Sequence, residues 1–251
     1  MVLCLTIISK KMNQIFKENP IILHIETATE ICSIAISKGS ELIGIKEETK
    51  GFSHAEKMIP FIDHLLKDTN ISPPEIDAIA VSIGPGSYTG LRIGASTAKG
   101  LCYALDIPVI TISSLLSIAE GAKNELSHLE KKIWFAPMID ARRMEVYTAL
   151  YKADGDLLND IHAEIIDHDS FKDILETQKV IFCGNGMPKS KEILSQHAHA
   201  IFSEAPLSAK NMILPALKKY QNAQFEDVAY FEPFYLKEYI PGKSTVKGLR
   251  K

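Results

Sequence analysis

The most distinctive local pattern is the glycine-rich run GPGSYTGLRIG, which extends from Gly84 to Gly94 between a predicted buried strand and a predicted helix. Glycines at such a junction let backbone N–H groups and a helix N-terminus converge on an anion such as a phosphate. The run has neither the lysine of a Walker loop nor the GxGxxG spacing of a dinucleotide-binding turn. The same glycines suit a tight turn that needs positive φ. An anion-binding turn and a structural turn therefore remain as alternatives.

Arg92 adds a charge to this run. It falls in the first turn of the predicted helix, where a cation opposes the helix macrodipole by about 0.3–1 kcal/mol. Compensation requires either an anionic ligand or a carboxylate of the chain itself close to Arg92. The sequence leaves both alternatives open.

The other reactive side chains form no recognisable catalytic or metal-binding pattern. The eight histidines include neither HExxH nor HxxxH, and His197 and His199 would share one face of a strand without an obvious third ligand. The four cysteines contain no CxxC pair, which argues against a zinc site and against a secreted disulfide framework. Ser87 does not stand in the GxSxG elbow of hydrolases. We therefore expect no metal site and no catalytic residue.

Two predicted helices offer surfaces that could face a partner. The helix after the glycine-rich run carries small residues, namely Gly94, Ala95, Ala98 and Gly100. Small side chains let another backbone approach closely, and that backbone belongs either to the chain's own sheet or to a second protein. The preceding helix begins with a capping-box pattern of Ser53 and Glu56. We expect His54 and Glu56 to be structural or partner-facing rather than catalytic.

The predicted elements form a duplicated βββαβαβα unit. The first half reads strands Ile21–Glu26, Ile31–Ser37 and Glu41–Glu48, helix Ser53–Lys67, strand Ile76–Ile83, helix Thr89–Leu105, strand Pro108–Ile112 and a helix to Ala122. The second reads strands Lys132–Ile139, Met144–Tyr151 and Leu157–Ile166, helix Ser170–Glu176, strand Val180–Cys183, helix Met187–Ser195, strand Ala198–Phe202 and helix Ser208–Tyr220. This order predicts an α/β, actin-like fold (the Hsp70 and sugar-kinase architecture) of two lobes facing each other across a cleft.

Four domains are predicted: an N-terminal extension (1–19), a first, partner-binding lobe (20–122), a second lobe (123–232) and a basic C-terminal tail (233–251). The earliest apolar run, Val2–Ile8, is far shorter than the ~20 residues of a membrane span. Lysines follow this run rather than precede it, which is the wrong order for a signal peptide. We therefore expect a cytoplasmic protein without a membrane partner. The charged stretch Asp140–Tyr147 is interpreted as a hairpin with an internal salt bridge.

The composition is that of a globular protein. The 251 residues are 46% hydrophobic and 24% charged, with a net charge of −3. A net acidic chain argues against a protein wrapped in nucleic acid, although it is compatible with a local basic patch.

Four segments together resemble the bacterial tRNA threonylcarbamoyladenosine biosynthesis proteins of TsaB type. They are Ile22–Thr29 (ILHIETAT), Ser53–Pro60 (SHAEKMIP), Gly84–Gly94 with Ala98–Leu101, and Asp140–Arg142 with Glu145–Tyr147. Two later segments, Gly184–Gly186 and Phe234–Lys237, resemble family landmarks more weakly. The glycine-rich run is the most specific of these strings, and the resemblance covers about residues 21–151.

The resemblance implies a non-catalytic partner subunit in the transfer of a threonylcarbamoyl group from threonylcarbamoyl-AMP to N6 of adenosine 37 in tRNA. It implies a TsaD-type transferase subunit and a TsaE-type ATPase subunit as partners, a homodimer when the chain is alone, and tRNA contacted indirectly through the complex. No cofactor of its own is implied, and ATP or ADP is expected at the complex interface.

Two departures from related sequences bear on catalysis. The catalytic relatives carry an HxxxH metal pair, and here Ser114 and Ile118 take the ligand places. The family usually opens with Asp-Thr-Ser, whereas this chain has Glu26-Thr27-Ala28. Both departures favour a degenerate paralogue over the alternatives, which are an ATP-dependent phosphotransferase and a metallo-glycoprotease-like enzyme of the same fold.

Two sets of site residues follow from the resemblance. The residues expected to contact a nucleotide shared with the partner are Glu26, Thr27, Gly84, Gly86, Ser87, Thr89 and Arg92. The residues expected at the partner interface are His54, Met58, Arg92, Ala95, Ala98, Lys99 and Cys102. The resemblance also implies that the helices Ser53–Lys67 and Thr89–Leu105 form a four-helix seam with the same two helices of the partner.

Overall fold

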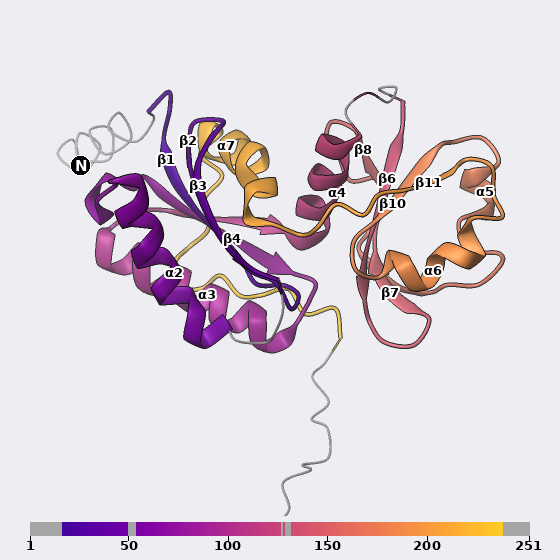
Figure 1. Cartoon of the computed structure of the whole chain (residues 1–251), viewed down its shortest axis with the longest axis horizontal. Coiled ribbons are helices and arrows are strands. Elements are labelled where there is room, and N and C mark those ends of the chain that lie inside the picture. Colours follow the sequence, from indigo (N-terminus) through magenta and orange to yellow (C-terminus); the bar gives the residue numbers. More distant parts are fainter. Residues whose placement is uncertain (1–16, 50–53, 127, 129–131, 238–251) are drawn as a thin grey trace, which may run out of the picture.

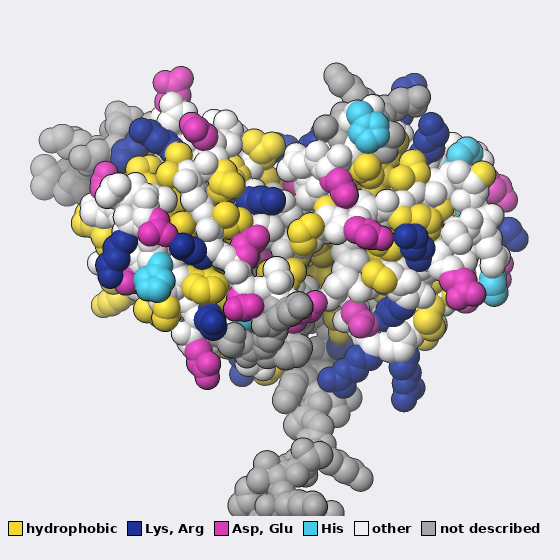
Figure 2. Space-filling view, in the orientation of Figure 1, with side chains coloured by type: hydrophobic (Ala, Val, Ile, Leu, Met, Phe, Trp, Pro, Cys, Tyr) yellow, Lys and Arg dark blue, Asp and Glu magenta, His cyan; other side chains and the backbone are white. Residues whose placement is uncertain are grey.

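The computed structural model describes residues 17–49, 54–126, 128 and 132–237, and the structural statements that follow concern these residues. They form two α/β lobes, each built around its own sheet (Figure 1), and the lobes lie side by side (Figure 2). Three predicted features lie outside the described residues: the N-terminal extension up to residue 16, the cap at position 53 and the tail beyond residue 237.

The first sheet has five strands in the order β3-β2-β1-β4-β5. The strands are β1 (Ile21–Glu26), β2 (Cys32–Lys38), β3 (Glu41–Glu48), β4 (Ala78–Gly84) and β5 (Val109–Ser113). The first three form an antiparallel meander, and β4 and β5 extend the sheet as parallel strands. Both faces of β1 and β4 are buried, which explains why these segments are almost continuously apolar.

Two long helices, α2 (His54–Thr69) and α3 (Tyr88–Leu105), lie along one face of this sheet (Figure 1). Their apolar stripes include Met58, Ile62, Leu65, Ala95, Ala98 and Cys102 and pack in one core with Leu23, Ile25, Ile79 and Val81 of the sheet. Ser87 caps α3, because its Oγ accepts a hydrogen bond from the Gly90 N–H at 3.3 Å.

The second sheet repeats the strand order of the first. Its order is β11-β10-β6-β7-β9, with the short β8 pairing separately to β6. The strands are β6 (Trp134–Asp140), β7 (Glu145–Thr148), β8 (Tyr151–Lys152), β9 (His162–Ile165), β10 (Val180–Cys183) and β11 (Ala200–Phe202). Counting from the outer meander strand, both sheets read third, second, first, fourth, fifth. The duplicated fold is therefore confirmed.

Two helices tie the lobes together. α4 (Ser114–Glu125) packs in a core with Phe135, Ile181 and Cys183 of the second sheet. The 3-10 helix η2 (Ala209–Met212) and α7 (Ile213–Gln221) pack on the face of the first sheet opposite α2 and α3, in a core that includes Ala78, Ala80 and Tyr220. The helix predicted at 208–220 was expected within the second lobe, and that expectation is corrected, because small alanines on the first sheet admit it there.

The second lobe departs from the predicted elements in three places. The helix predicted at 170–176 shortens to α5 (Lys172–Leu175), whereas α6 (Met187–Leu194) matches closely. The strand predicted at 144–151 breaks between β7 and β8, because the Leu150 N–H donates to Asn159 Oδ1 (2.6 Å) instead of continuing the ladder. The strand predicted from residue 157 begins only at His162. Within the described part of the chain, every helix is too short or too polar to cross a bilayer.

Candidate functional site

The glycine-rich turn packs against the loop between β1 and β2. A Cβ atom at Gly86 would lie 2.3 Å from the Ala28 carbonyl oxygen, and one at Gly90 would lie 2.1 Å from the Thr27 carbonyl oxygen. The space that a phosphate would need beside these glycines is therefore occupied by the backbone of the chain itself. Close approach of two backbone segments is what the glycines provide here.

The polar backbone groups of the turn are also engaged within the chain. The Ser87 N–H donates to the Ala28 carbonyl at 2.6 Å, and the Leu91 N–H donates to the Ser87 carbonyl at 2.9 Å. Gly84 adopts φ +118°, and the Phe234 carbonyl oxygen lies 2.5 Å from the position of a Cβ there, so the C-terminal segment covers the turn from its other side. The turn does not fit a phosphate cradle.

Glu26 lies at the end of β1, beneath this packing. It is fully buried; Oε1 accepts a hydrogen bond from the Ala28 N–H at 2.8 Å, and Oε2 has no partner among the described residues. Burial raises the pKa of Glu26 to about 7, although hydrogen bonds involving Ala28, Ser82 and Thr27 oppose that rise. A carboxyl group in this position stabilises the β1–β2 loop rather than meeting a ligand.

The residues predicted to contact a nucleotide differ in how far the chain itself covers them, and their contact with a nucleotide stays a prediction. Glu26, Thr27 and Gly84 are covered by the chain, and Gly86 and Ser87 are only partly accessible. Of the set, Thr89 and Arg92 are exposed. The physical reason is that Thr27 and Ala28 occupy the concave side of the turn.

In the described chain, two tyrosine side chains contact Arg92. Its Nε donates to the Tyr235 hydroxyl at 3.2 Å, and its guanidinium carbon lies 4.2 Å from the centre of the Tyr88 ring. No carboxylate of the described chain lies within ion-pair distance of it. The hydrogen bond with Tyr235 raises the pKa of Arg92. Two aromatic rings, 4.7 Å apart, thus hold the cation.

Across the cleft, side chains of the second lobe meet the first. The Asn185 side-chain amide donates to Glu30 Oε2 at 3.5 Å, while its oxygen accepts from the Asp140 N–H at 3.0 Å. Asp140 forms an ion pair with Lys189 of α6 (2.5 Å), which corrects the expected salt bridge within the hairpin. Partial burial raises the pKa of Asp140, but the hydrogen bonds from Lys189 and from the Arg142 N–H together outweigh burial and lower it.

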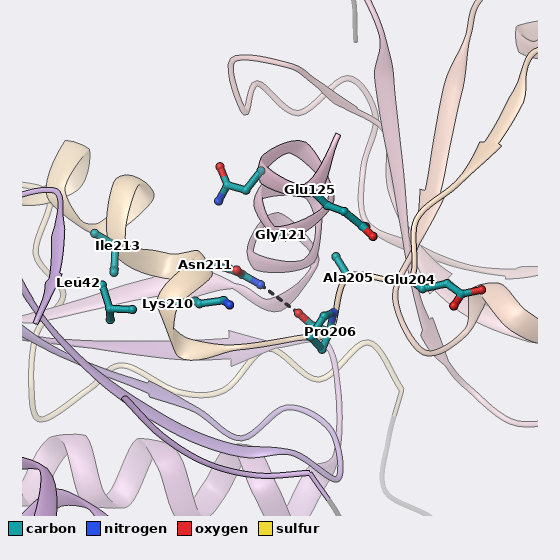
Figure 3. A pocket seen from close by; sticks show the side chains of 10 residues that line it. Leu42, Gly121, Glu125, Glu204, Ala205, Pro206, Lys210, Asn211 and Ile213 are labelled. Carbon is teal, nitrogen blue, oxygen red and sulfur yellow. Dashed lines mark hydrogen bonds between the residues drawn. The ribbon is translucent and has the colours of Figure 1, made fainter. Parts of the chain in front are cut away.

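Two pockets flank the segment that connects the lobes. One, of about 370 Å³, lies in the cleft and is lined by residues that include Glu30, Asn185 and Glu204. The other, of about 430 Å³, lies between α4, the connecting segment and η2 (Figure 3). There the Asn211 amide donates to the Pro206 carbonyl at 3.2 Å, and a Cβ at Gly121 would lie 2.5 Å from the Asn211 nitrogen. This second pocket is a structural joint between the lobes.

The positions that hold metal ligands in the catalytic relatives are buried. Ser114 is 0% and Ile118 is 1% exposed, on the first turns of α4. Ile118 packs in the core shared by the lobes. Within the described ranges, no group of three or more His, Cys, Asp or Glu side chains could hold a metal ion.

The residues predicted at the partner interface make contacts within the chain, and their place at an interface stays a prediction. Buried in the first lobe are His54, Met58, Ala95, Ala98 and Cys102. His54 Nε2 donates to the Thr29 carbonyl at 2.7 Å, so its function is structural. Lys99 donates to the Ala229 carbonyl at 2.9 Å, and Arg92 is held by Tyr235. The small residues of α3 thus serve the chain's own sheet, and a charged residue at Ala98 would unfold the lobe.

Six of the exposed residues on the same two helices are uncharged and lie outside the predicted set. We call them the α2–α3 outer face, and they are Ala55, Ile59 and Pro60 of α2 and Ser96, Gly100 and Tyr103 of α3. The exposed residues of these helices also include Glu56, Asp63, His64, Lys67, Asp68, Thr89, Arg92 and Ala104. Ile59 is 57% exposed and Tyr103 is 87% exposed. Large apolar side chains this exposed on neighbouring helices are typical of a surface that another protein covers.

Comparison with known proteins supplies the family. The family model "TsaD: tRNA N6-adenosine threonylcarbamoyltransferase" matches residues 31–239. The tRNA threonylcarbamoyladenosine biosynthesis protein TsaB of Buchnera aphidicola subsp. Schizaphis graminum is 30% identical over 175 residues, which cover 68% of this chain and 81% of that protein. The chain belongs to this family, among its TsaB-type members.

Other TsaB-type proteins match over a shorter stretch. The Haemophilus influenzae protein is 38% identical over 130 residues, and the Bacillus subtilis protein is 36% identical over 140 residues. The chain spans about half the length of these curated relatives, 53% and 58% respectively. The solved structure of YeaZ from Pseudomonas aeruginosa has a TM-score of 0.76 at 24% identity and covers 86% of this chain and all of that one, which shows a shared fold.

Several functional contacts were not predicted from the sequence of this TsaB-type chain. Tyr88 and Tyr235 stack although 147 positions apart in the chain, and Asn185 joins the lobes. Signals for them existed, because Tyr88 lies inside the glycine-rich run and the other two lie in the weaker family landmarks. What the sequence lacked was any indication that these three segments meet.

Proposed function

We propose that this chain is the non-catalytic partner subunit of the complex that transfers a threonylcarbamoyl group from threonylcarbamoyl-AMP to N6 of adenosine 37 in tRNA. Its partners are a TsaD-type transferase subunit and a TsaE-type ATPase subunit, and in their absence it pairs with a second copy of itself. The names of the TsaB-type relatives support a place in threonylcarbamoyladenosine synthesis.

The single observation that carries this proposal is that the chain itself fills the concave side of the glycine-rich turn. Thr27 and Ala28 occupy the concave side of the glycine-rich run, and the run's own N–H groups donate within the chain. A catalytic member of the fold needs that space for phosphates. We infer that the chain holds no nucleotide of its own and that ATP or ADP in the complex lies at the interface with the partner.

The α2–α3 outer face supports the partner part of the proposal. It has two large exposed apolar side chains, Ile59 and Tyr103, on helices whose inner faces are completely occupied by the chain's own core. Outward residues of a helix pair are free to vary without loss of fold, so apolar residues there favour a bound partner. The interface is thus proposed on the two helices expected from the sequence but on their opposite sides.

One alternative keeps a specific observation in its favour. The pKa of Glu26 near 7 and its unpartnered Oε2 are features that catalytic acids share, and an ATP-dependent phosphotransferase would use a carboxylate at this strand end. Its burial under the β1–β2 loop argues against that use. A metallo-glycoprotease-like enzyme has less support, because Ser114 and Ile118 occupy the ligand positions.

The experiment is a pair of assays on the full chain, alone and with its TsaD-type subunit. Transfer of threonylcarbamoyl to a tRNA transcript should require both subunits, and steady-state ATP hydrolysis by the chain alone should equal that of its Glu26→Gln variant. ATP hydrolysis by the chain alone that disappears in Glu26→Gln would establish the phosphotransferase alternative instead.

A further inference from the structure

A third pocket lies on the second lobe, away from the cleft and from the α2–α3 outer face. It has a volume of about 600 Å³, within the ~300–1,000 Å³ range of ligand pockets. Its lining includes Lys123, Lys132, Trp134, Lys152, Asp154 and Gln178. A lysine-rich pocket is unexpected in a chain with a net charge of −3.

The sheet positions the two central residues of the pocket. Trp134 begins β6 and lies directly opposite Lys152 of β8 in the antiparallel pair, so their side chains share one face. Trp134 is half-buried, with part of its indole packed against the core of the second lobe. The Gln178 amide donates to the carbonyls of Lys132 and Lys179, which fixes the wall where β6 begins.

The charges of the pocket are only partly neutralised. Lys123 forms an ion pair with Glu120 at 3.2 Å. Asp154 accepts a hydrogen bond from the Asp156 N–H at 3.1 Å within the turn after β8. Lys132 and Lys152 are exposed, and neither lies within ion-pair distance of any described carboxylate. Two lysines that have no ion pair with a carboxylate in the described ranges therefore flank one partly exposed indole.

Cations beside an aromatic ring recognise a particular chemistry. Ammonium groups bind backbone phosphates, and an indole stacks on an unpaired base, which is how proteins hold single-stranded RNA. The Gln178 amide donates to the Lys132 and Lys179 carbonyls, so its oxygen is the atom that can accept a hydrogen bond from a base edge. We propose that this pocket binds an unpaired nucleotide and the adjoining phosphates of RNA, so that the chain contacts tRNA directly. This inference rests on the proposed function for the identity of the RNA.

The chain offers a direct probe, because Trp134 is its single tryptophan. Adding an unmodified tRNA transcript, or oligoadenylate, to the full chain at low salt should quench the indole fluorescence in a saturable manner. The logarithm of the binding constant should fall linearly with the logarithm of salt concentration.

Charge reversal at the two exposed lysines gives the test variant. Lys132→Glu with Lys152→Glu should weaken RNA binding at least tenfold and reduce the salt slope by about 1.4, because each single-strand phosphate contact contributes about 0.7. The matched control is Lys38→Glu with Lys218→Glu, which reverses the same charge at two exposed lysines of the first-lobe side. The control should bind RNA within about twofold of the native chain.

Three results would overturn the inference. The first is the absence of saturable quenching, and the second is an equal loss of binding in the control variant. The third is RNA binding that leaves the indole fluorescence unchanged and that inorganic polyphosphate displaces. That result would mean that the lysines attract phosphates without any base stacking on Trp134. Co-purification of each variant with the TsaD-type subunit is measured in parallel. If RNA does not quench the fluorescence but the native chain still co-purifies with the TsaD-type subunit, only the RNA site is refuted. If the native chain does not co-purify with that subunit, the proposed function is refuted.

Discussion

The two lobes have the same strand order but differ in the helices that cover their sheets. In the first lobe α2 and α3 have 16 and 18 residues, whereas their counterparts α5 and α6 have 4 and 8. Only the longer pair has a continuous outer face beyond what its own sheet requires. The comparison indicates that the duplicated sheet determines the fold of each lobe, while the length of the covering helices depends on the outer surface that the lobe exposes.

The glycine turns of the two lobes are more alike than their helices. Gly84 ends β4 and Gly184 directly follows β10, both with positive φ, 118° and 90°. Two residues later, Gly86 faces the Ala28 carbonyl, and the Gly186 N–H donates to the Met138 carbonyl at 3.0 Å. The first turn is therefore closed by the loop after β1, and the second by β6 itself.

The largest effect is expected at Gly90. Gly90→Ala places a methyl group 2.1 Å from the Thr27 carbonyl oxygen and should lower the free energy of unfolding by about 3 kcal/mol or more. In the second lobe, Gly186→Ala has its nearest neighbour at 3.0 Å and should cost less, about 1 kcal/mol. Urea unfolding followed by circular dichroism measures both.

Gly100 is the matched control on the same helix. A Cβ there meets nothing within 4 Å, so Gly100→Ala should stabilise the chain by up to about 1 kcal/mol through helix propensity. Equal effects of the alanine substitutions at positions 90 and 186 would contradict the closer backbone contact described at Gly90.

A second prediction compares the residues that end β1 and β6, Glu26 and Asp140. The pKa of Glu26 in the folded chain is about 7, above its ordinary value of 4.5. As pH rises, the unfolded chain therefore loses this proton at a lower pH than the folded chain does. Stability from this group is therefore complete below about pH 4.5 and is lost as pH rises to about 7. Glu26→Gln should stabilise the chain by about 2–3 kcal/mol at pH 8 and by almost nothing at pH 4.

Asp140 should behave in the opposite sense. Its folded pKa is lowered, so the stability that it contributes is present above its usual range and is lost as pH falls through the folded pKa. The carboxylate is 47% exposed, so Asp140→Asn should cost at most about 1 kcal/mol at neutral pH. If the free energy of unfolding depends on pH in the same way in Glu26→Gln and in the native chain between pH 4 and 8, the predicted contribution of Glu26 is refuted.

The smallest effects concern the C-terminal segment, whose Tyr235 contacts the first lobe and whose Lys237 contacts the second. Tyr235→Ala removes the stacking on Tyr88 and the hydrogen bond from Arg92, and it should cost about 1–1.5 kcal/mol. Lys237→Ala removes a half-exposed ion pair with Glu145 in the second lobe and should cost about 0.5 kcal/mol. Thermal unfolding of the two variants measures both losses of stability. A larger loss for Lys237→Ala than for Tyr235→Ala would contradict the prediction.

Much of the fold could be predicted because strand periodicity is local. The limits of β1 and β3 and the end of α3 match the prediction, and both sheets have the expected element order. Which residues of a helix pack on the chain's own sheet, and which face a partner, could not be predicted in the same way. Small residues such as Ala98 suit a sheet and a partner equally, and only the distance between α3 and β4 separates these cases. The contacts of Arg92 were unpredictable because Tyr235 is 143 residues away.

The central claim is that the α2–α3 outer face binds the transferase partner and that the second lobe does not. The direct measurement is the dissociation constant for the TsaD-type subunit by calorimetry, with Ile59→Lys and Tyr103→Lys combined in one variant. Its matched control combines Leu157→Lys and Ile165→Lys, which are 48% and 67% exposed on the second lobe. Circular dichroism should be native for both, because all four side chains are exposed.

The account predicts at least about 100-fold weaker binding for the first variant, since a lysine placed in an apolar interface is desolvated, and a change within about threefold for the control. Unchanged affinity in the first variant, or an equal loss in the control, would contradict the claim that the long helices of the first lobe exist to hold a partner.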